Sequence, residues 1–173
     1  MGVPVKPEKA ILFVGCLFAR HDIFESAEAL LTENFGSVYF KSQVVPWNYS
    51  TYYEREMTSP LFRIFCFFER IIDPSYLAEA KLRTNEIEQQ FAADDRRQIN
   101  LDPGYITPAK VILASTKNYS HRVYLSKGIY GEVALLYKNK NYQSLPYTYR
   151  DYQDPIFIDV FKQARCFFKK TER

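Results

Sequence analysis

The apolar and polar positions along the chain predict an ordered succession of strands and helices. Residues 10–18, AILFVGCLF, form a continuous apolar run, which is typical of a strand buried on both faces. Asp22, followed three positions later by Glu25, has the pattern of a capping box, and apolar residues then recur at helical spacing until Gly36, a helix stop. Residues 37–45 alternate between apolar and polar types, which indicates a half-buried strand.

A second strand, helix and strand follow. Residues 61–71 form an apolar strand, and Asp73-Pro74 then begins a helix that runs to about residue 91. Residues 97–102 alternate again, with apolar side chains on one side only. The order predicts an α+β fold, in which residues of about 9–102 form a ferredoxin-like βαββαβ sandwich with an antiparallel sheet and the helices on one face.

The rest of the chain, about 103–173, extends this core by a β-hairpin and a helix. Thr107-Pro108 is expected to begin a short helix that ends at Ala114, and residues 121–137 are expected to form the hairpin. Asp154, followed by a proline, begins the last helix. The 173 residues suit a single domain.

The segment Asp102-Pro103-Gly104 has the composition of a β-turn. Proline fits the second position of such a turn, and glycine fits the third, where a type II turn requires positive φ. We therefore expect positive φ at Gly104, and a cost of about 1 kcal/mol or more for Gly104→Ala.

The hairpin can be aligned from its side chains. A three-residue loop, Ser126 to Gly128, sets Arg122 opposite Glu132 and Tyr124 opposite Tyr130. Two interpretations of the polar face stay open. It is either a solvated face with a surface ion pair of little energetic worth, or a site in which Arg122 binds an anion and Glu132 orients it.

The composition and the net charge limit the classes of protein to which the chain can belong. The net charge is only +3, but 14 Tyr and 14 Phe are many, and the tyrosine hydroxyls must reach solvent or a lined groove. Cys16, Cys66 and Cys166 stand in apolar runs and are expected to be buried free thiols. Without a signal peptide or an apolar run of membrane-spanning length, the chain is expected to be cytoplasmic, with no membrane partner.

Two polar rows are candidates for one binding site. Asn100 and Asp102 lie on the same side of a predicted strand, and Lys81, Asn85 and Glu88 lie along one flank of the helix before it. Each row also has a simpler explanation, ordinary surface polarity, and this explanation is favoured for the helix row. The Tyr-rich loop at 46–60 is long enough to be functional, although its glutamates Glu54 and Glu56 are expected to be solvated.

Together with the hairpin, these rows give a mixed set of acids, amides and cations that suits a phosphate-bearing ligand. If the site holds a metal, Asp102 and Glu132 would be its ligands and Mg²⁺ the ion. The predicted ligand-binding residues are Lys81, Asn85, Glu88, Asn100, Asp102, Lys110, Lys117, His121, Arg122, Tyr124 and Glu132.

The motif INLDPGY at 99–105, followed by TPAKVILASTKNYSHRVYLSKGIYGEVALLY at 107–137, resembles an uncharacterised prokaryotic family, domain of unknown function 4416. YYEREM at 52–57, KLRTNEIE at 81–88 and LPYTYRDY at 145–152 are similar to it as well. The resemblance spans nearly the whole chain and implies no activity.

Three functions follow as hypotheses. The first is binding of a nucleotide or another phosphorylated, anionic ligand in a Tyr-lined polar cleft, either as a binding protein or as an enzyme of phosphoryl or nucleotidyl chemistry. The second is a single-stranded RNA or nucleic-acid binding module, with exposed tyrosines as stacking platforms. The third is a non-catalytic interaction domain or homo-oligomer, anchored by exposed aromatic side chains.

Overall fold

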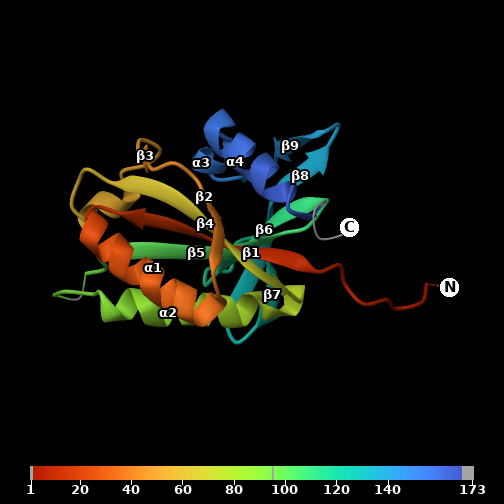
Figure 1. The fold of residues 1–173 in the computed structure, drawn as a ribbon, viewed down its shortest axis with the longest axis horizontal. Helices are drawn as coiled ribbons and strands as arrows, with labels where there is room; N and C mark the ends of the chain where they lie inside the picture. The colour runs from red at the N-terminus through yellow and green to blue at the C-terminus, as the bar shows by residue number, and fades with distance from the viewer. Residues whose placement is uncertain (1, 95, 169–173) are drawn as a thin grey trace.

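The computed structural model describes residues 2–94 and 96–168, and one antiparallel sheet of nine strands runs through them (Figure 1). The path of neighbouring strands is β2-β4-β1-β5-β6-β8-β7, with β3 paired to β4 and β9 paired to β8. The strands are β1 (Ala10–Phe18), β2 (Val38–Lys41), β3 (Val45–Pro46), β4 (Phe62–Ile72), β5 (Ile99–Ile106), β6 (Lys110–Ser115), β7 (Val123–Ser126), β8 (Ile129–Lys138) and β9 (Asn141–Ser144).

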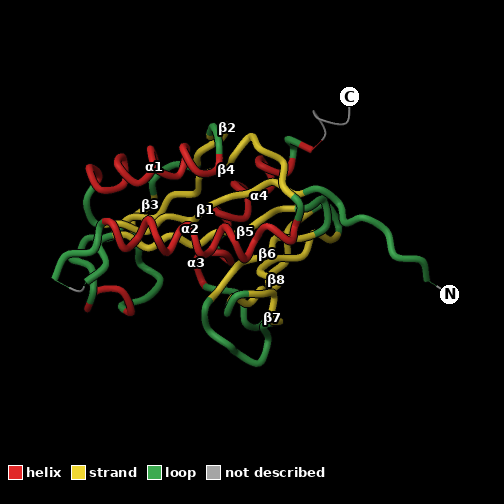
Figure 2. The backbone as a smooth tube through the Cα atoms, turned by 90° about the horizontal axis from the view of Figure 1, so that it is seen from below, coloured by secondary structure: helices red, strands yellow, loops and turns green. Residues whose placement is uncertain are grey.

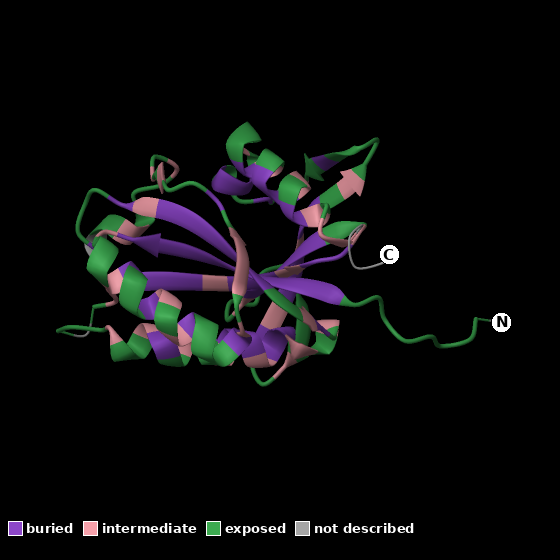
Figure 3. Cartoon of the chain, in the orientation of Figure 1, coloured by how far each residue is buried: buried purple, intermediate pink, exposed green. Residues whose placement is uncertain are grey.

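Helices cover both faces of the sheet. They are α1 (His21–Phe35), α2 (Leu77–Gln90), α3 (Arg150–Gln153) and α4 (Pro155–Arg165), with the 3-10 turns η1 (Tyr52–Arg55) and η2 (Pro74–Tyr76). Alternate residues of β1, from Ala10 to Phe18, pack against α1 and α2, whereas Phe13 packs against Phe161 of α4 on the other face. Figures 1 and 2 show α1 and α2 together on one side of the strands, and Figure 3 shows that β1 is buried throughout.

The predicted α+β class with an antiparallel sheet is therefore confirmed. The predicted strands at 10–18 and 61–71 are β1 and β4, and β1 lies in the interior of the sheet, between β4 and β5. The strand predicted at 37–45 is split into β2 and β3 because Ser42 interrupts it. The Ser42 hydroxyl accepts a hydrogen bond from the Phe65 N–H at 3.0 Å, in place of a backbone carbonyl.

Two of the four predicted helix starts have the expected cap. The Asp73 carboxylate accepts a hydrogen bond from the Ser75 N–H, and the Asp154 carboxylate accepts one from the Ile156 N–H. The capping box at Asp22 is wrong: the helix begins after Arg20, and the Asp22 carboxylate pairs with the Arg20 guanidinium instead.

The helix predicted after Thr107-Pro108 is wrong, because this segment is a hairpin leading into β6. The Thr107 N–H donates to the Lys110 carbonyl at 2.9 Å, which closes a tight turn. Residues 111–113 then enter the sheet between β5 and β8, where a β-branched apolar run packs well.

The prediction of a turn at Asp-Pro-Gly is also wrong. β5 passes straight through it, and positive φ occurs at the glycines Gly36 and Gly128 but not at Gly104. Gly104 is required by packing instead, since a Cβ there would lie 2.4 Å from the Ile112 carbonyl oxygen and 2.4 Å from the ring of Phe13.

The β7–β8 hairpin has the predicted pairing of Tyr124 with Tyr130. Its turn is one residue shorter than expected: Ser126 pairs with Ile129, and the left-handed residues are Lys127 and Gly128, with φ of 52° and 77°. The register shift at residue 125 absorbs the difference.

No helix of the described residues is long and apolar enough to cross a membrane. Cys16 and Cys66 are buried as predicted, but Cys166 is exposed because it follows the end of α4.

Candidate functional site

A cleft opens where β5 and β6 separate. Their ladder ends at the pair Gly104–Leu113, and the preceding residue of β5, Pro103, has no N–H to offer a neighbour. Side chains of α2 satisfy the free edge that remains: Lys81 Nζ donates to the Leu101 carbonyl at 2.9 Å, and the Leu101 N–H donates to Glu88 at 2.6 Å. The cleft therefore begins beside the INLDPGY segment, along the part of β5 that does not pair with β6.

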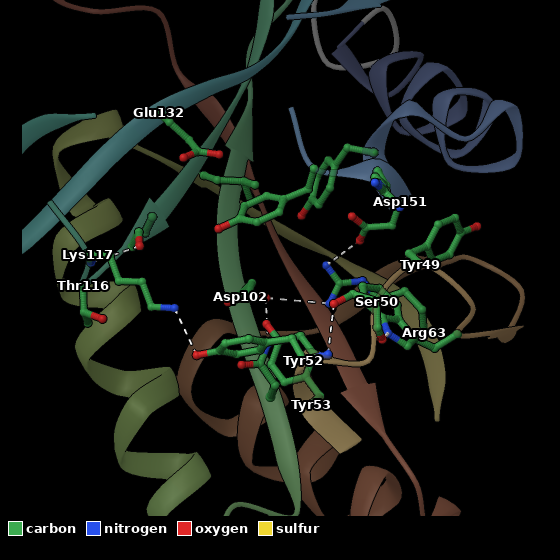
Figure 4. Close-up of a pocket in the computed structure, with 18 of the residues that line it drawn as sticks. Tyr49, Ser50, Tyr52, Tyr53, Arg63, Asp102, Thr116, Lys117, Glu132 and Asp151 are labelled. Carbon is green, nitrogen blue, oxygen red and sulfur yellow. Dashed lines mark hydrogen bonds and ion pairs between the residues drawn. The ribbon is translucent and has the colours of Figure 1, made fainter. Parts of the chain in front are cut away.

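The cleft is a cavity of about 1010 Å³. Its walls are the Tyr-rich segment 47–54, one flank of α2, the first half of β5, residues 113–119 after the ladder ends, and residues 149–152 at α3. Figure 4 shows Arg63 and Asp102 between Asp151 on one side and Tyr52 and Tyr53 on the other.

Asp102 lies at the centre of one hydrogen-bonded group. It accepts a hydrogen bond from the Asn100 amide at 2.7 Å, and it pairs with Lys81 at 3.5 Å and with Arg63 at 3.8 Å. Burial alone would raise the pKa of Asp102, but the two cations and the amide lower it below the usual value. Asp102 is therefore an ionised, fully partnered carboxylate.

Arg63 of β4 is the least satisfied buried cation in the cavity. The residue is only 3% exposed, and it forms ion pairs with Asp151 at 3.2 Å and with Asp102 at 3.8 Å. Among the described residues, none accepts a well-aligned hydrogen bond from its guanidinium, and its Nε is buried without a partner. Because a buried charged donor without an acceptor is costly, Arg63 retains capacity for a ligand.

The surroundings of Arg63 hold the guanidinium in place. It lies against the ring of Phe65 at 4.8 Å and those of Trp47 and Tyr152 at 5.8 and 5.9 Å. Gly15 of the neighbouring strand provides the space, since a Cβ there would lie 2.8 Å from Arg63 Nη2.

Three buried acceptors around the cavity also lack hydrogen-bond partners among the described residues, although one of them, Oδ2 of Asp151, is the atom that pairs with Arg63 Nη2 at 3.2 Å. They are Oδ2 of Asp151, Oε1 of Glu132 and the hydroxyl of Tyr152, and each is buried. Burial raises the pKa of Tyr152 well above its usual value; Arg63 opposes this rise, whereas Asp151, Asp102 and Glu132 add to it. All four charges therefore act on one hydroxyl, and we call Arg63, Asp102, Glu132, Asp151 and Tyr152 the inner cluster.

Arg122, in contrast, is already occupied. It donates to Glu132 at 2.6 Å, to Ser115 and Tyr149 at 2.7 Å each, and to the Lys117 carbonyl at 3.1 Å. The pair with Glu132 is buried, so the interpretation as a solvated surface pair is wrong. Arg122 joins three segments of the cavity wall, and few of its donors remain for an anion.

The mouth of the cavity carries exposed charge. The ammonium of Lys117 contacts Tyr52, with 3.2 Å to the hydroxyl oxygen and 4.8 Å to the ring centre, and Arg150 also lines the opening. Arg150 forms no ion pair with any residue in the described ranges. Glu54 is the exposed acid on this side.

The structure brings most of the predicted site residues to this cavity. Those that line it are Lys81, Asn85, Glu88, Asn100, Asp102, Lys117, Arg122 and Glu132. Three others do not line it. Lys110 is at the opposite end of β6, Tyr124 is exposed on β7, and His121 reaches Glu132 from outside the cavity while it stacks on Tyr147.

The described residues contain no group of three or more His, Cys, Asp or Glu that could hold a metal ion. Asp102 faces Lys81 and Arg63, and Glu132 faces Arg122 and His121. Because cations already compensate both carboxylates, this arrangement does not favour Mg²⁺.

The sequence reasoning missed Arg63, Asp151 and Gly15. A signal for two of them was present. Arg63 is a single cation within the apolar run LFRIFCFF, and Gly15 is a glycine within a buried strand, which often marks a close approach. Asp151 had no such signal, because its partner Arg63 is distant along the chain.

A family model described as "Domain of unknown function (DUF4416)" matches residues 8–168, nearly the whole chain. No curated protein and no solved structure matches the chain significantly.

Proposed function

The chain belongs to this family, whose description assigns no activity, and we propose from the site itself that the protein binds a nucleotide or another small phosphorylated ligand in the cavity. The observation that carries the proposal is the inner cluster, in which Nε of Arg63, Oε1 of Glu132 and the hydroxyl of Tyr152 are buried without a hydrogen-bond partner among the described residues, and Oδ2 of Asp151 has only its ion pair with Arg63 at 3.2 Å. A ligand that presents both acceptors and donors would satisfy them.

The charges at the mouth support an anionic group on this ligand. Lys117 and Arg150 are exposed, and the contacts of Lys117 are with the neutral Tyr52. A phosphate at the opening would gain two cations without breaking a buried ion pair. The tyrosines of the segment 47–54 provide aromatic surface for the rest of the ligand.

The proposal is tested by calorimetric titration of AMP and ribose 5-phosphate beside adenosine and ribose. We expect the phosphorylated members to bind more tightly. The double change Lys117→Ala and Arg150→Ala should remove most of this difference, by about tenfold in Kd. Lys110→Ala is the matched control, an exposed lysine outside the cavity. Equal affinity with and without the phosphate would refute the proposal.

We also infer that the first half of the chain has a ferredoxin-like core. Its strands follow the order β2-β4-β1-β5, and the helices α1 and α2 cover one face of them. This order agrees with a βαββαβ unit in which the last strand lies beside the first. RNA-binding proteins of such folds use the opposite sheet face, but here α4 packs on it. The packing therefore favours the cavity over an open RNA platform.

An interaction or oligomerisation role has less support. The edge strand β7 exposes Val123, Tyr124 and Leu125, which form a short apolar strip. A four-residue edge with a register shift is a poor template for pairing with another chain.

A further inference from the structure

The inner cluster has a chemical preference of its own. Its buried donor without a partner is Nε of Arg63, and its acceptors without a hydrogen bond are Oε1 of Glu132 and Oδ2 of Asp151, the second of which is ion-paired with Arg63 Nη2 at 3.2 Å. A phosphate group accepts hydrogen bonds but, as a dianion, donates none, so it would leave both carboxylate oxygens unsatisfied and would be repelled by them. A hydroxyl group donates and accepts, and it matches both kinds of atom.

The charges that line the cavity also favour a hydroxyl group, rather than a phosphate, at the inner cluster. Away from the mouth of the cavity the cations Arg63, Lys81, Arg97 and Arg122 are matched by Asp102, Asp151, Glu88 and Glu132. These equal numbers leave no excess positive charge for a phosphate. At the mouth, Lys117 and Arg150 face one exposed acid, Glu54, so the excess of positive charge is there.

Aromatic side chains lie around Arg63 and in the wall of the cavity. Trp47, Phe65 and Tyr152 surround the guanidinium of Arg63 and shield it from bulk water. Phe65 and Tyr152 are themselves buried, but Trp47, Tyr49 and Tyr53 are half-buried in the cavity wall. Aromatic faces beside polar groups suit a sugar ring, whose C–H groups pack on the rings while its hydroxyls bond the polar atoms.

Resting on the function proposed above, we propose that the inner cluster is a sugar-hydroxyl subsite, with Arg63, Asp151 and Glu132 as its specificity-determining residues. The ligand enters sugar first. One hydroxyl accepts from Arg63 and donates to Asp151, a second hydroxyl donates to Oε1 of Glu132, and the phosphate stays at Lys117 and Arg150.

The test compares two probes by calorimetry. Ribose 5-phosphate carries hydroxyls and a phosphate, and pentyl phosphate carries the phosphate and five carbons without the hydroxyls. We expect the wild-type protein to bind ribose 5-phosphate at least about tenfold more tightly, because pentyl phosphate leaves buried polar groups unpaired.

Glu132→Gln should abolish this preference with little effect on pentyl phosphate. The Gln carbonyl can keep the bonds to Arg122 and His121, so that its NH₂ group replaces Oε1 and meets the ligand hydroxyl as a second donor. Glu54→Gln, at the exposed mouth, is the matched control and should retain the preference.

Equal affinity of the wild-type protein for the two probes would overturn the subsite, and this comparison needs no variant. An unchanged preference in Glu132→Gln would overturn the role of Glu132. Binding of free ribose as tightly as ribose 5-phosphate would support the subsite and refute the phosphate at the mouth. Failure of ribose and ribose 5-phosphate to bind, with binding of pentyl phosphate, would refute the subsite alone.

Discussion

Replacement of Arg122 by alanine should destabilise the protein strongly. The side chain is buried, with four hydrogen bonds, and its removal leaves the buried carboxylate of Glu132 with His121 as its only remaining side-chain partner among the described residues. Breaking a buried ion pair on one side costs about 3–5 kcal/mol. For a chain of this size the melting temperature should fall by roughly 6–20 °C.

Urea denaturation followed by circular dichroism measures the change as a shift of the midpoint at constant slope. Arg83→Ala is the control, since Arg83 pairs with Glu79 and Glu86 on the exposed surface of α2 and should contribute under about 1 kcal/mol. A loss of less than about 1 kcal/mol for Arg122→Ala would refute the reasoning. Arg122→Met combined with Glu132→Met should recover part of the stability, because no buried charge is then left unpaired.

Two further predictions concern β5. Gly104→Ala should lower the free energy of unfolding by about 1–3 kcal/mol or more in urea denaturation, because its Cβ would meet a backbone carbonyl. Gly131→Ala is the control and should cost clearly less, because its Cβ would meet the exposed Leu125 side chain at 3.3 Å. Similar losses in the two variants would refute this explanation. Asp102 has a pKa lowered on folding, so its stabilisation is complete above the unfolded value of about 3.9 and is lost as the pH falls through the folded value. Urea midpoints from pH 6 to 2.5 should therefore fall less steeply for Asp102→Asn, and an equally steep fall would contradict the assignment.

The sequence alone determined the elements whose signals are local. Apolar runs located β1 and β4, helical periodicity located α1, α2 and α4, and Asp73 and Asp154 marked two helix starts. The hairpin pairing of Tyr124 with Tyr130 was also readable, because the two strands are joined by a tight turn. Each of these depends on side chains within a few positions of one another.

The same local reasoning failed where distant strands decide the outcome. Asp-Pro-Gly has the residues of a turn, yet it is a strand because β1 pairs along its whole length and β6 begins to pair at Gly104. Residues 110–115 follow a helix-start signal, yet they form β6 because β5 and β8 lie on either side. Pairing with the neighbouring strands of the sheet outweighs these local preferences.

The residues of the candidate site were likewise predictable from the sequence only in part. Sequence spacing placed Lys81 and Glu88 on one helix flank and Asn100 and Asp102 on one strand face, and these rows do meet. Only the tertiary structure decided that Arg122 is buried and occupied while Arg63 retains unused donors. The physical reason is that a side chain's type is written in the sequence, but the number of its hydrogen bonds already satisfied depends on partners brought from distant segments, here Asp151 on α3 for Arg63.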